Sequence, residues 1–161
     1  MKAVILAAGK GTRIHEVTHG QPKCLLSFGT RTILDWQIQG LLSAGISKVA
    51  IVVGHNADSV VNHVELNYAD RSHRFHFIQN PEYDKTNNIY SLWLAQDWLR
   101  RSDFLCLNAD VLCHPGILAA AAKGPGLVSM VIDPAWRDET MKVVIRQGRV
   151  LRMSKGIAHT D

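Results

Sequence analysis

The chain has few of the residue types that hold together disulfide-rich or zinc-binding domains. Only three of its 161 residues are cysteine, and they form no C-x-x-C pair. An odd number of cysteines gives no complete disulfide framework, which favours a reduced, cytoplasmic chain. Cys106, Cys113 and His114 lie close in sequence but lack the spacing of zinc ligands. The other histidines lack that spacing as well. Neither disulfides nor zinc are therefore expected to organise this fold.

Long apolar runs are also missing. The first run, residues 3–8, is far too short for a transmembrane helix, and its flanks do not match a signal peptide. The formal net charge is only +4, and the basic residues are dispersed and not clustered with aromatic ones. Such a distribution suits small anionic substrates better than a nucleic-acid groove. We therefore expect small-molecule substrates and neither a membrane nor a nucleic acid as partner.

A glycine-rich segment directly follows this first apolar run. Gly9 and Gly11 have no Cβ, so the backbone there can approach a ligand and point its N–H groups at phosphate oxygens. Arg13 adds a planar guanidinium that matches phosphate, and Lys23 adds a mobile positive charge. Two better-known glycine loops do not fit, because Ile14 stands where the dinucleotide fingerprint needs a third glycine and no window matches the P-loop. The segment predicts a polyphosphate site of another kind.

The run Leu6–Arg13 (LAAGKGTR), followed by Pro22-Lys23, resembles the signature of the nucleotidyltransferase (NTP transferase) superfamily. These enzymes join a nucleoside triphosphate to a phosphorylated small molecule. The resemblance implies a nucleotide-binding loop made by Ala8, Gly9, Gly11, Thr12, Arg13 and Lys23. It also implies catalytic roles for Arg13 on the β- and γ-phosphates and for Lys23 on the α-phosphoryl group.

A carboxylate stands at the end of a later apolar strand. Residues 105–108 read as a buried strand, and Asp110 follows it closely. Ligands of open α/β sheets lie beyond the carboxyl ends of the strands, so Asp110 should face the same crevice as the glycine loop. An aspartate that merely starts a turn is the alternative interpretation. The superfamily usually has Gly-Asp here, and Ala109 departs from that pattern. By resemblance, Asp110 is the ligand of a Mg²⁺ cofactor and a catalytic residue.

The run Asn87–Leu92 (NNIYSL) looks like the phosphocholine cytidylyltransferase branch, which includes relatives acting on aminoalkyl phosphonates. Asn87 and Asn88 are good helix-capping residues, and two amides at the mouth of a crevice could also contact a base or ribose. Ring faces hold quaternary ammonium groups, which makes Tyr90 and Trp136 the candidate acceptor-binding residues. Trp93 and Trp98 are interpreted as core residues instead.

Alternating helical and strand patterns predict the fold. We expect an α/β, Rossmann-like, doubly wound three-layer sandwich of the nucleotidyltransferase type, with a mostly parallel sheet. The chain is expected to form a single domain, 1–161. The pattern predicts one helix over 34–42, a second that begins after a cap at Asn56, and a third over 89–101. It predicts strands over 3–8, 49–53, 74–79, 104–108 and 128–132. The last two strands, 142–146 and 150–153, are predicted to form a hairpin.

The chemistry that follows needs no protein nucleophile, because the acceptor's own phosphate can attack the α-phosphorus of the nucleotide. CTP with phosphocholine or an aminoalkyl phosphonate is the favoured pair. A sugar-1-phosphate nucleotidyltransferase and a non-catalytic nucleotide-binding regulatory domain stay open as alternatives, and a homodimer is compatible with the sequence. The superfamily's second metal carboxylate generally lies beyond Asp161, and among the later aspartates only Asp133 follows an apolar run. We therefore expect an incomplete C-terminal part and a chain that binds nucleotide but turns over poorly.

Overall fold

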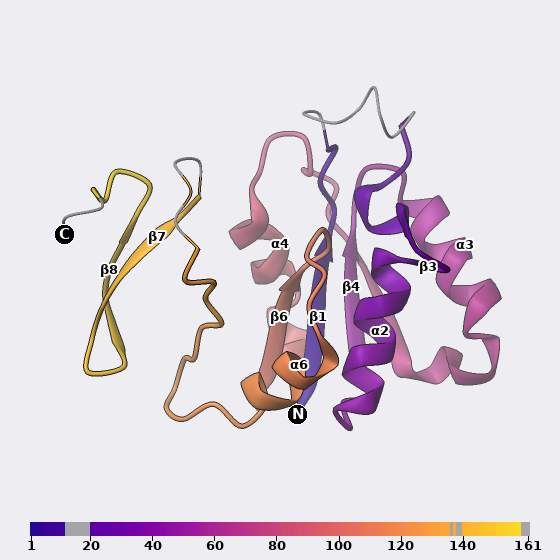
Figure 1. Cartoon of the computed structure of the whole chain (residues 1–161). Coiled ribbons are helices and arrows are strands. Elements are labelled where there is room, and N and C mark those ends of the chain that lie inside the picture. Colours follow the sequence, from indigo (N-terminus) through magenta and orange to yellow (C-terminus); the bar gives the residue numbers. More distant parts are fainter. Residues whose placement is uncertain (12–19, 136, 138–139, 159–161) are drawn as a thin grey trace. The chain divides into compact units, whose positions relative to one another are not determined.

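The structure is a computed structural model that describes residues 1–11, 20–135, 137 and 140–158. The chain divides into two compact units, an N-terminal unit (Met1–Ser129) and a C-terminal unit (Met130–Asp161). Figure 1 shows the elements of both. The N-terminal unit contains β1 (Lys2–Ala7), η2 (Lys23–Leu25), β2 (Ser27–Phe28), β3 (Arg31–Thr32), α2 (Ile33–Ser43), β4 (Val49–Val53), α3 (Ala57–Asn67), η3 (Ala69–Arg74), β5 (Phe75–Gln79), α4 (Asn88–Leu94), α5 (Gln96–Leu99), β6 (Phe104–Asn108) and α6 (Pro115–Ala121).

The centre of the N-terminal unit is a four-stranded parallel sheet in the order β5-β4-β1-β6. The chain starts in the middle of the sheet with β1, moves outward through β4 to β5, and returns to the other side of β1 with β6. This reversal of strand order defines a doubly wound sheet, and it creates a crevice at the carboxyl ends of β1 and β6. The predicted fold class is confirmed, including the place of β5 at an edge.

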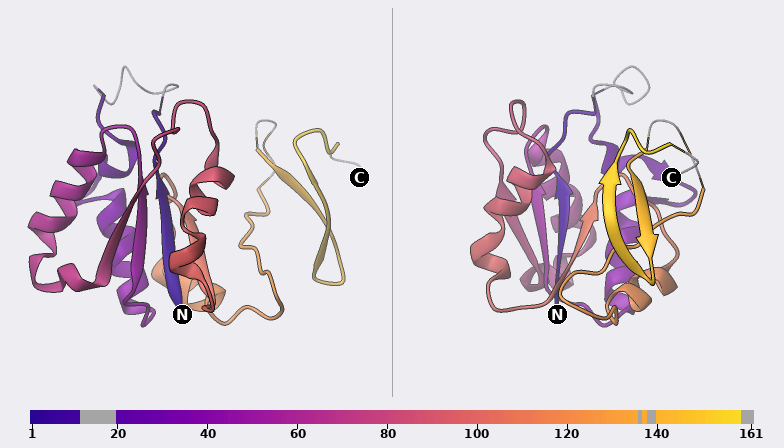
Figure 2. Two further views of the ribbon diagram at one scale, coloured as in Figure 1. Left: turned by 180° about the vertical axis from the view of Figure 1, so that it is seen from behind. Right: turned by 90° about the vertical axis from the view of Figure 1, so that its left-hand side faces the viewer.

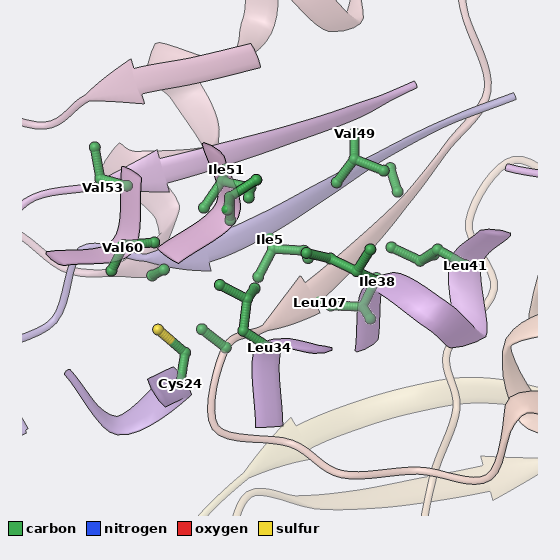
Figure 3. Packing of buried hydrophobic residues seen from close by; sticks show 14 of the residues in the cluster. Ile5, Cys24, Leu34, Ile38, Leu41, Val49, Ile51, Val53, Val60 and Leu107 are labelled. Carbon is green, nitrogen blue, oxygen red and sulfur yellow. The ribbon is translucent and has the colours of Figure 1, made fainter. Parts of the chain in front are cut away.

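Helices cover both faces of the sheet and so produce three layers (Figures 1 and 2). One face packs against α2, α3 and α6, and Figure 3 shows Ile5 of β1 beside Leu34 and Ile38 of α2. The opposite face packs against the region of α4 and α5 through Ala95 and Leu99. β1 and β4 are buried on both faces, which explains why their sequences read as unbroken apolar runs.

A polar network fixes the start of α2. Thr32 and Asp35 form a capping box, in which each side chain bonds the other's backbone N–H. The Asp35 carboxylate also accepts hydrogen bonds from His63 Nε2 at 2.9 Å and from the Tyr68 hydroxyl at 3.0 Å. Burial alone would raise the pKa of Asp35, but these hydrogen bonds together hold the pKa below its ordinary value. The network therefore stabilises a charged carboxylate between α2 and α3.

The C-terminal unit contains an antiparallel hairpin of β7 (Lys142–Arg146) and β8 (Arg149–Ser154). Gln147 and Gly148 connect the two strands with φ angles of 50° and 72°, which a tight hairpin turn requires. The hairpin predicted from the sequence is confirmed. In the part of the chain that the structure describes, no helix is long and apolar enough to cross a membrane.

Two local predictions are wrong, and a third is confirmed only in part. The segment Val128–Ile132 is not a strand, and no described strand pairs with it. A β-branched run needs a partner strand and a packing surface to become a strand, because β-propensity mostly reports packing. The helix predicted over 89–101 breaks at Ala95 into α4 and α5, where the backbone tightens to place Ala95 against the sheet. Asn56 occupies the N-cap position of α3 as predicted, but the capping hydrogen bond expected of its side chain is absent, since that side chain donates to the Gly20 carbonyl.

Candidate functional site

A cavity of about 280 Å³ lies at the carboxyl ends of β1 and β6, where the strand order reverses. It belongs entirely to the N-terminal unit. The cavity is surrounded by the backbone of the glycine loop, one cationic side chain, one carboxylate and two side-chain amides. Its lining comprises Leu6, Ala7, Gly9, Gly11, Lys23, Cys24, Asn88, Asn108, Ala109 and Asp110. Small residues together with charged and amide groups suit a polar, phosphorylated ligand.

Lys23 begins η2 and lies directly against the glycine loop. Gly11 has a φ of +66°, and a Cβ built there would be 2.9 Å from Cε of Lys23. Gly11 therefore serves two purposes, since it adopts a left-handed conformation and leaves room for the lysine side chain. The Lys23 ammonium lies 3.9 Å from the Asp110 carboxylate, and the two side chains are 27% and 55% exposed. At this exposure the pair is reachable by a ligand and adds little to stability.

Asp110 is carried by a tight turn at the end of β6. The N–H of Val111 donates to the Asn108 carbonyl at 3.2 Å, which closes the turn, and the N–H of Ala109 donates to the Leu6 carbonyl at 3.2 Å. The second bond ties the turn to the end of β1. The glycine loop and the carboxylate are thus brought together because β1 and β6 are paired neighbours, with Leu6 opposite Asn108.

Two asparagines link the far wall of the cavity to the turn. The Asn88 side chain donates to Oδ1 of Asn108 at 2.9 Å, which connects the first residue of α4 to the last residue of β6. Asn87 caps α4 by accepting a hydrogen bond from the N–H of Ile89 at 3.1 Å. Asn80, almost fully buried, donates to the Ser91 hydroxyl at 3.0 Å and so anchors the loop that leads into α4. These bonds place Asn88 beside the cavity.

Cys24 also lines the cavity, yet its chemistry excludes a nucleophilic role. Burial, together with the nearby negative charge of Asp110, raises the pKa of the Cys24 thiol to about 12. A thiol with that pKa is almost entirely protonated near pH 7, and the thiolate is the reactive form. Cys24 therefore acts as a small apolar residue of the core.

The donor set fits a magnesium ion that is shared with a ligand. Among the described residues, Asp110 is the one carboxylate that lines the cavity, and no group of three or more His, Cys, Asp or Glu could hold a metal ion. Mg²⁺ typically uses one or two carboxylates and takes its other oxygen atoms from substrate phosphates and water. Asp133, the other aspartate considered from the sequence, lies in the C-terminal unit and accepts a hydrogen bond from Ala135 N at 2.9 Å.

The structure brings five of the sequence-predicted residues together around the cavity: Gly9, Gly11, Lys23, Asn88 and Asp110. Ala8 and Asn87 lie next to lining residues but do not line it. The Ala8 carbonyl accepts a hydrogen bond from His55 N at 3.1 Å, which ties the glycine loop to the end of β4. Thr12, Arg13 and Trp136 lie outside the described residues, as do Asp138 and Asp161.

Tyr90 is not part of the cavity lining, and it stacks on Trp93 with ring centroids 5.4 Å apart. The core interpretation of Trp93 is wrong, since 53% of that residue is exposed. The apolar pattern failed here because α4 is a short helix, and Ser91, not Trp93, is the residue it buries. Trp98, in contrast, packs against the sheet-facing cluster of Ala95 and Leu99, as predicted.

Sequence reasoning missed Asn108 and Gln37. Asn108 is the polar last residue of an otherwise apolar strand, and this place at the carboxyl end of a strand is the signal that could have identified it. Gln37 lies on the buried face of α2 and bonds the turn that carries Asp110. A lone amide at helical spacing among Leu34, Ile38 and Leu41 was the signal that could have identified it.

Comparison with known proteins gives a consistent result. The model of the MobA-like NTP transferase domain matches residues 3–153, which is most of the chain. CTP:phosphoglutamine cytidylyltransferase of Campylobacter jejuni is 32% identical over 141 residues, covering 84% of this chain and 54% of that protein. This chain thus spans about half the length of that relative.

Solved structures resemble the chain as well. The CTP:phosphocholine cytidylyltransferase of Streptococcus pneumoniae aligns with a TM-score of 0.58 and 31% identity, over 68% of this chain and 44% of that one. The inositol-1-phosphate CTP transferase of T. maritima aligns with a TM-score of 0.78 over 97% of this chain and 64% of that one, and at 22% identity it supports the fold alone.

Proposed function

Because the chain belongs to the MobA-like NTP transferase family, we propose that it binds a nucleoside triphosphate and transfers the nucleotidyl group to a phosphorylated small molecule. One observation carries the proposal: the cavity brings the glycine loop, Lys23 and Asp110 together where the strand order reverses. The relatives that are named cytidylyltransferases favour CTP as the donor.

In this reaction an oxygen of the acceptor phosphate attacks the α-phosphorus of the nucleotide. A new P–O bond forms, the bond between the α-phosphorus and the bridging oxygen breaks, and pyrophosphate leaves with that oxygen. The attacking group needs no general base, because the second pKa of a phosphate monoester is about 6 and the group is mostly dianionic at pH 7. The chain's own task is to align the groups and to stabilise charge.

Each group at the cavity has a proposed role. Gly9 and Gly11 let the backbone approach the β- and γ-phosphates, and Arg13, assigned from the sequence motif alone, would bind the same phosphates. The Lys23 ammonium stabilises the charge that develops at the α-phosphoryl group. Asp110 would hold Mg²⁺, which when bound neutralises charge on the nucleotide phosphates.

We further propose that the acceptor carries a cationic nitrogen and that Tyr90 contacts it. Tyr90, which is partly buried, stacks on the exposed Trp93 on α4, the same helix whose first residue, Asn88, lines the cavity. Exposed ring faces attract quaternary ammonium groups. Trp136 is proposed as a second ring from its place in the sequence alone.

The test combines binding and turnover. Each of the four nucleoside triphosphates is titrated into the chain by calorimetry with Mg²⁺ present. Pyrophosphate release is then followed with phosphocholine, phosphoethanolamine or glucose 1-phosphate as acceptor. Tightest binding of CTP and product with an amino-bearing acceptor would support the proposal. Product with glucose 1-phosphate alone would favour a sugar-phosphate enzyme, and nucleotide binding without any product a regulatory domain. No nucleotide binding would refute all three.

A further inference from the structure

Gln37 is a polar residue in an apolar contact. It lies on α2, on the face that packs Leu34, Ile38 and Leu41 against the sheet, and only 2% of it is exposed. An amide buried in such a place is costly unless hydrogen bonds replace the water that it loses. Its partners therefore show what the residue does.

Both hydrogens of the Gln37 amide are used, and both go to one turn. Nε2 donates to the Asn108 carbonyl at 2.8 Å and to the Val111 carbonyl at 2.6 Å. These carbonyls are the two ends of the turn that the N–H of Val111 closes, and Asp110 is the third residue of that turn. Gln37 thus clamps the turn at its first and last residues.

The remaining atom of the amide argues against a role in stability alone. Oε1 of Gln37 is buried, and among the described residues it has no hydrogen-bond partner. An unpaired buried acceptor costs free energy, which offsets part of what the two donated hydrogen bonds contribute to stability. An apolar residue of similar volume could not hold two carbonyls of one turn at a fixed separation.

Among the described residues, the Ala109 N–H ties the turn to the Leu6 carbonyl, but Gln37 is the residue whose side chain bonds both the Asn108 and the Val111 carbonyls. The Asp110 side chain is more than half exposed, and its described contact is the 3.9 Å pair with Lys23, which does not fix a position by itself. Asn88 holds the turn from the opposite wall through the Asn108 side chain. The direction of the Asp110 carboxylate therefore depends on the backbone of the turn.

We propose that Gln37 is a positioning residue for nucleotidyl transfer: its buried amide fixes the turn from Asn108 to Val111 and so directs the Asp110 carboxylate into the cavity beside Lys23. The role rests on the proposed function. Gln37 itself does not line the cavity. Residues that orient a metal-binding side chain typically contribute roughly 10–100-fold to metal affinity or activity.

The test is CTP binding by calorimetry, with and without Mg²⁺, for the wild-type chain and for Gln37→Met. Methionine keeps the length and approximate volume of glutamine but donates no hydrogen bond. Gln37→Met should bind CTP without Mg²⁺ within about twofold of wild type, while the gain in affinity on adding Mg²⁺ falls roughly 10-fold or more. Ile38→Val is the matched control, because it perturbs the same buried face and leaves the clamp intact; its Mg²⁺-dependent gain should equal that of wild type.

The outcomes separate the clamp from the proposed function. If wild type binds none of the four nucleoside triphosphates, with or without Mg²⁺, the proposed function fails and this role falls with it. If wild type shows the gain and Gln37→Met keeps it, or if Gln37→Met loses Mg²⁺-free binding to the same extent, the positioning role alone is overturned. Thermal unfolding is monitored for each variant. Should Gln37→Met not fold, Gln37→Asn, whose amide is too short to reach both carbonyls, must show the same selective loss.

Discussion

Adding one methyl group at Gly11 should displace Lys23 and slow nucleotidyl transfer. In Gly11→Ala the new Cβ would lie 2.9 Å from Cε and 3.1 Å from Cγ of Lys23, closer than such atoms normally approach. The lysine side chain is flexible, so it will move instead of the backbone. A displacement of about 1 Å at a reacting group can cost on the order of 100-fold in rate. We expect transfer to fall roughly 10–100-fold.

The same methyl group also strains the backbone, and this effect must be separated from the first. An alanine at the left-handed φ of Gly11 costs roughly 1–2 kcal/mol relative to glycine. Gly29→Ala provides the control, because Gly29 has a φ of +65° and no atom within 4 Å of a built Cβ. Both variants should lose similar free energy of unfolding in urea titrations, and only Gly11→Ala should lose transfer activity.

Pyrophosphate release with CTP and phosphocholine measures the effect on transfer. In a Lys23→Ala background, the further change Gly11→Ala should have little additional effect on the rate, since the side chain that it displaces is already gone. Equal losses of transfer in Gly11→Ala and Gly29→Ala would refute the reasoning. So would full additivity of Gly11→Ala with Lys23→Ala.

Three further predictions address the cation, the fold and the acceptor. Lys23→Ala should cost about 3–4 kcal/mol of transition-state stabilisation while the circular dichroism spectrum is unchanged; turnover within a few-fold of wild type would exclude the assigned role. Asp35→Ala should lower the free energy of unfolding at pH 7 by roughly 2–3 kcal/mol, because it removes the carboxylate half of the capping box and partly buried hydrogen bonds to a charge. Since the folded-state pKa of Asp35 lies below 3.8, this contribution is fully present above that pH and is lost as the pH falls through the lower folded-state pKa, so the difference in urea midpoints should shrink in acid. Tyr90→Leu should weaken phosphocholine more than phosphoethanolamine in competition assays, and equal weakening of both would count against an aromatic contact with the trimethylammonium group.

Most of the sheet could be predicted from local sequence. Strands buried on both faces, such as β4, are short apolar runs between polar segments, and that pattern depends little on the rest of the chain. Val128–Ile132 shows the limit, because an equally apolar run becomes a strand only where a neighbour offers hydrogen bonds and a surface. The broken helix at Ala95 has the same origin, since the sheet, not helix propensity, determines where α4 ends.

In the candidate site, too, some residues could be predicted from local sequence and others could not. Gly11, Lys23 and Asp110 could be selected because their chemistry and spacing form a motif, and the structure places all three at one cavity. Gln37 carries no motif, and its partners lie 71 and 74 residues away in sequence. Its role depends on the contact between α2 and the turn that follows β6. This is a tertiary contact, and no local sequence pattern contains it.

The order of strands in the sheet also sets when a nascent chain can form the cavity. β1 is synthesised first, yet its second edge pairs with β6, where Lys2 stands opposite Phe104. At about 5–20 residues per second, the ribosome needs roughly 5–20 s to make the intervening segment. During that interval an apolar strand has one unpaired edge, and the glycine loop lacks the opposite wall of its pocket. Nucleotide binding should therefore report the pairing of β6 with β1, and nucleotide present during synthesis should trap only chains in which that pairing is complete.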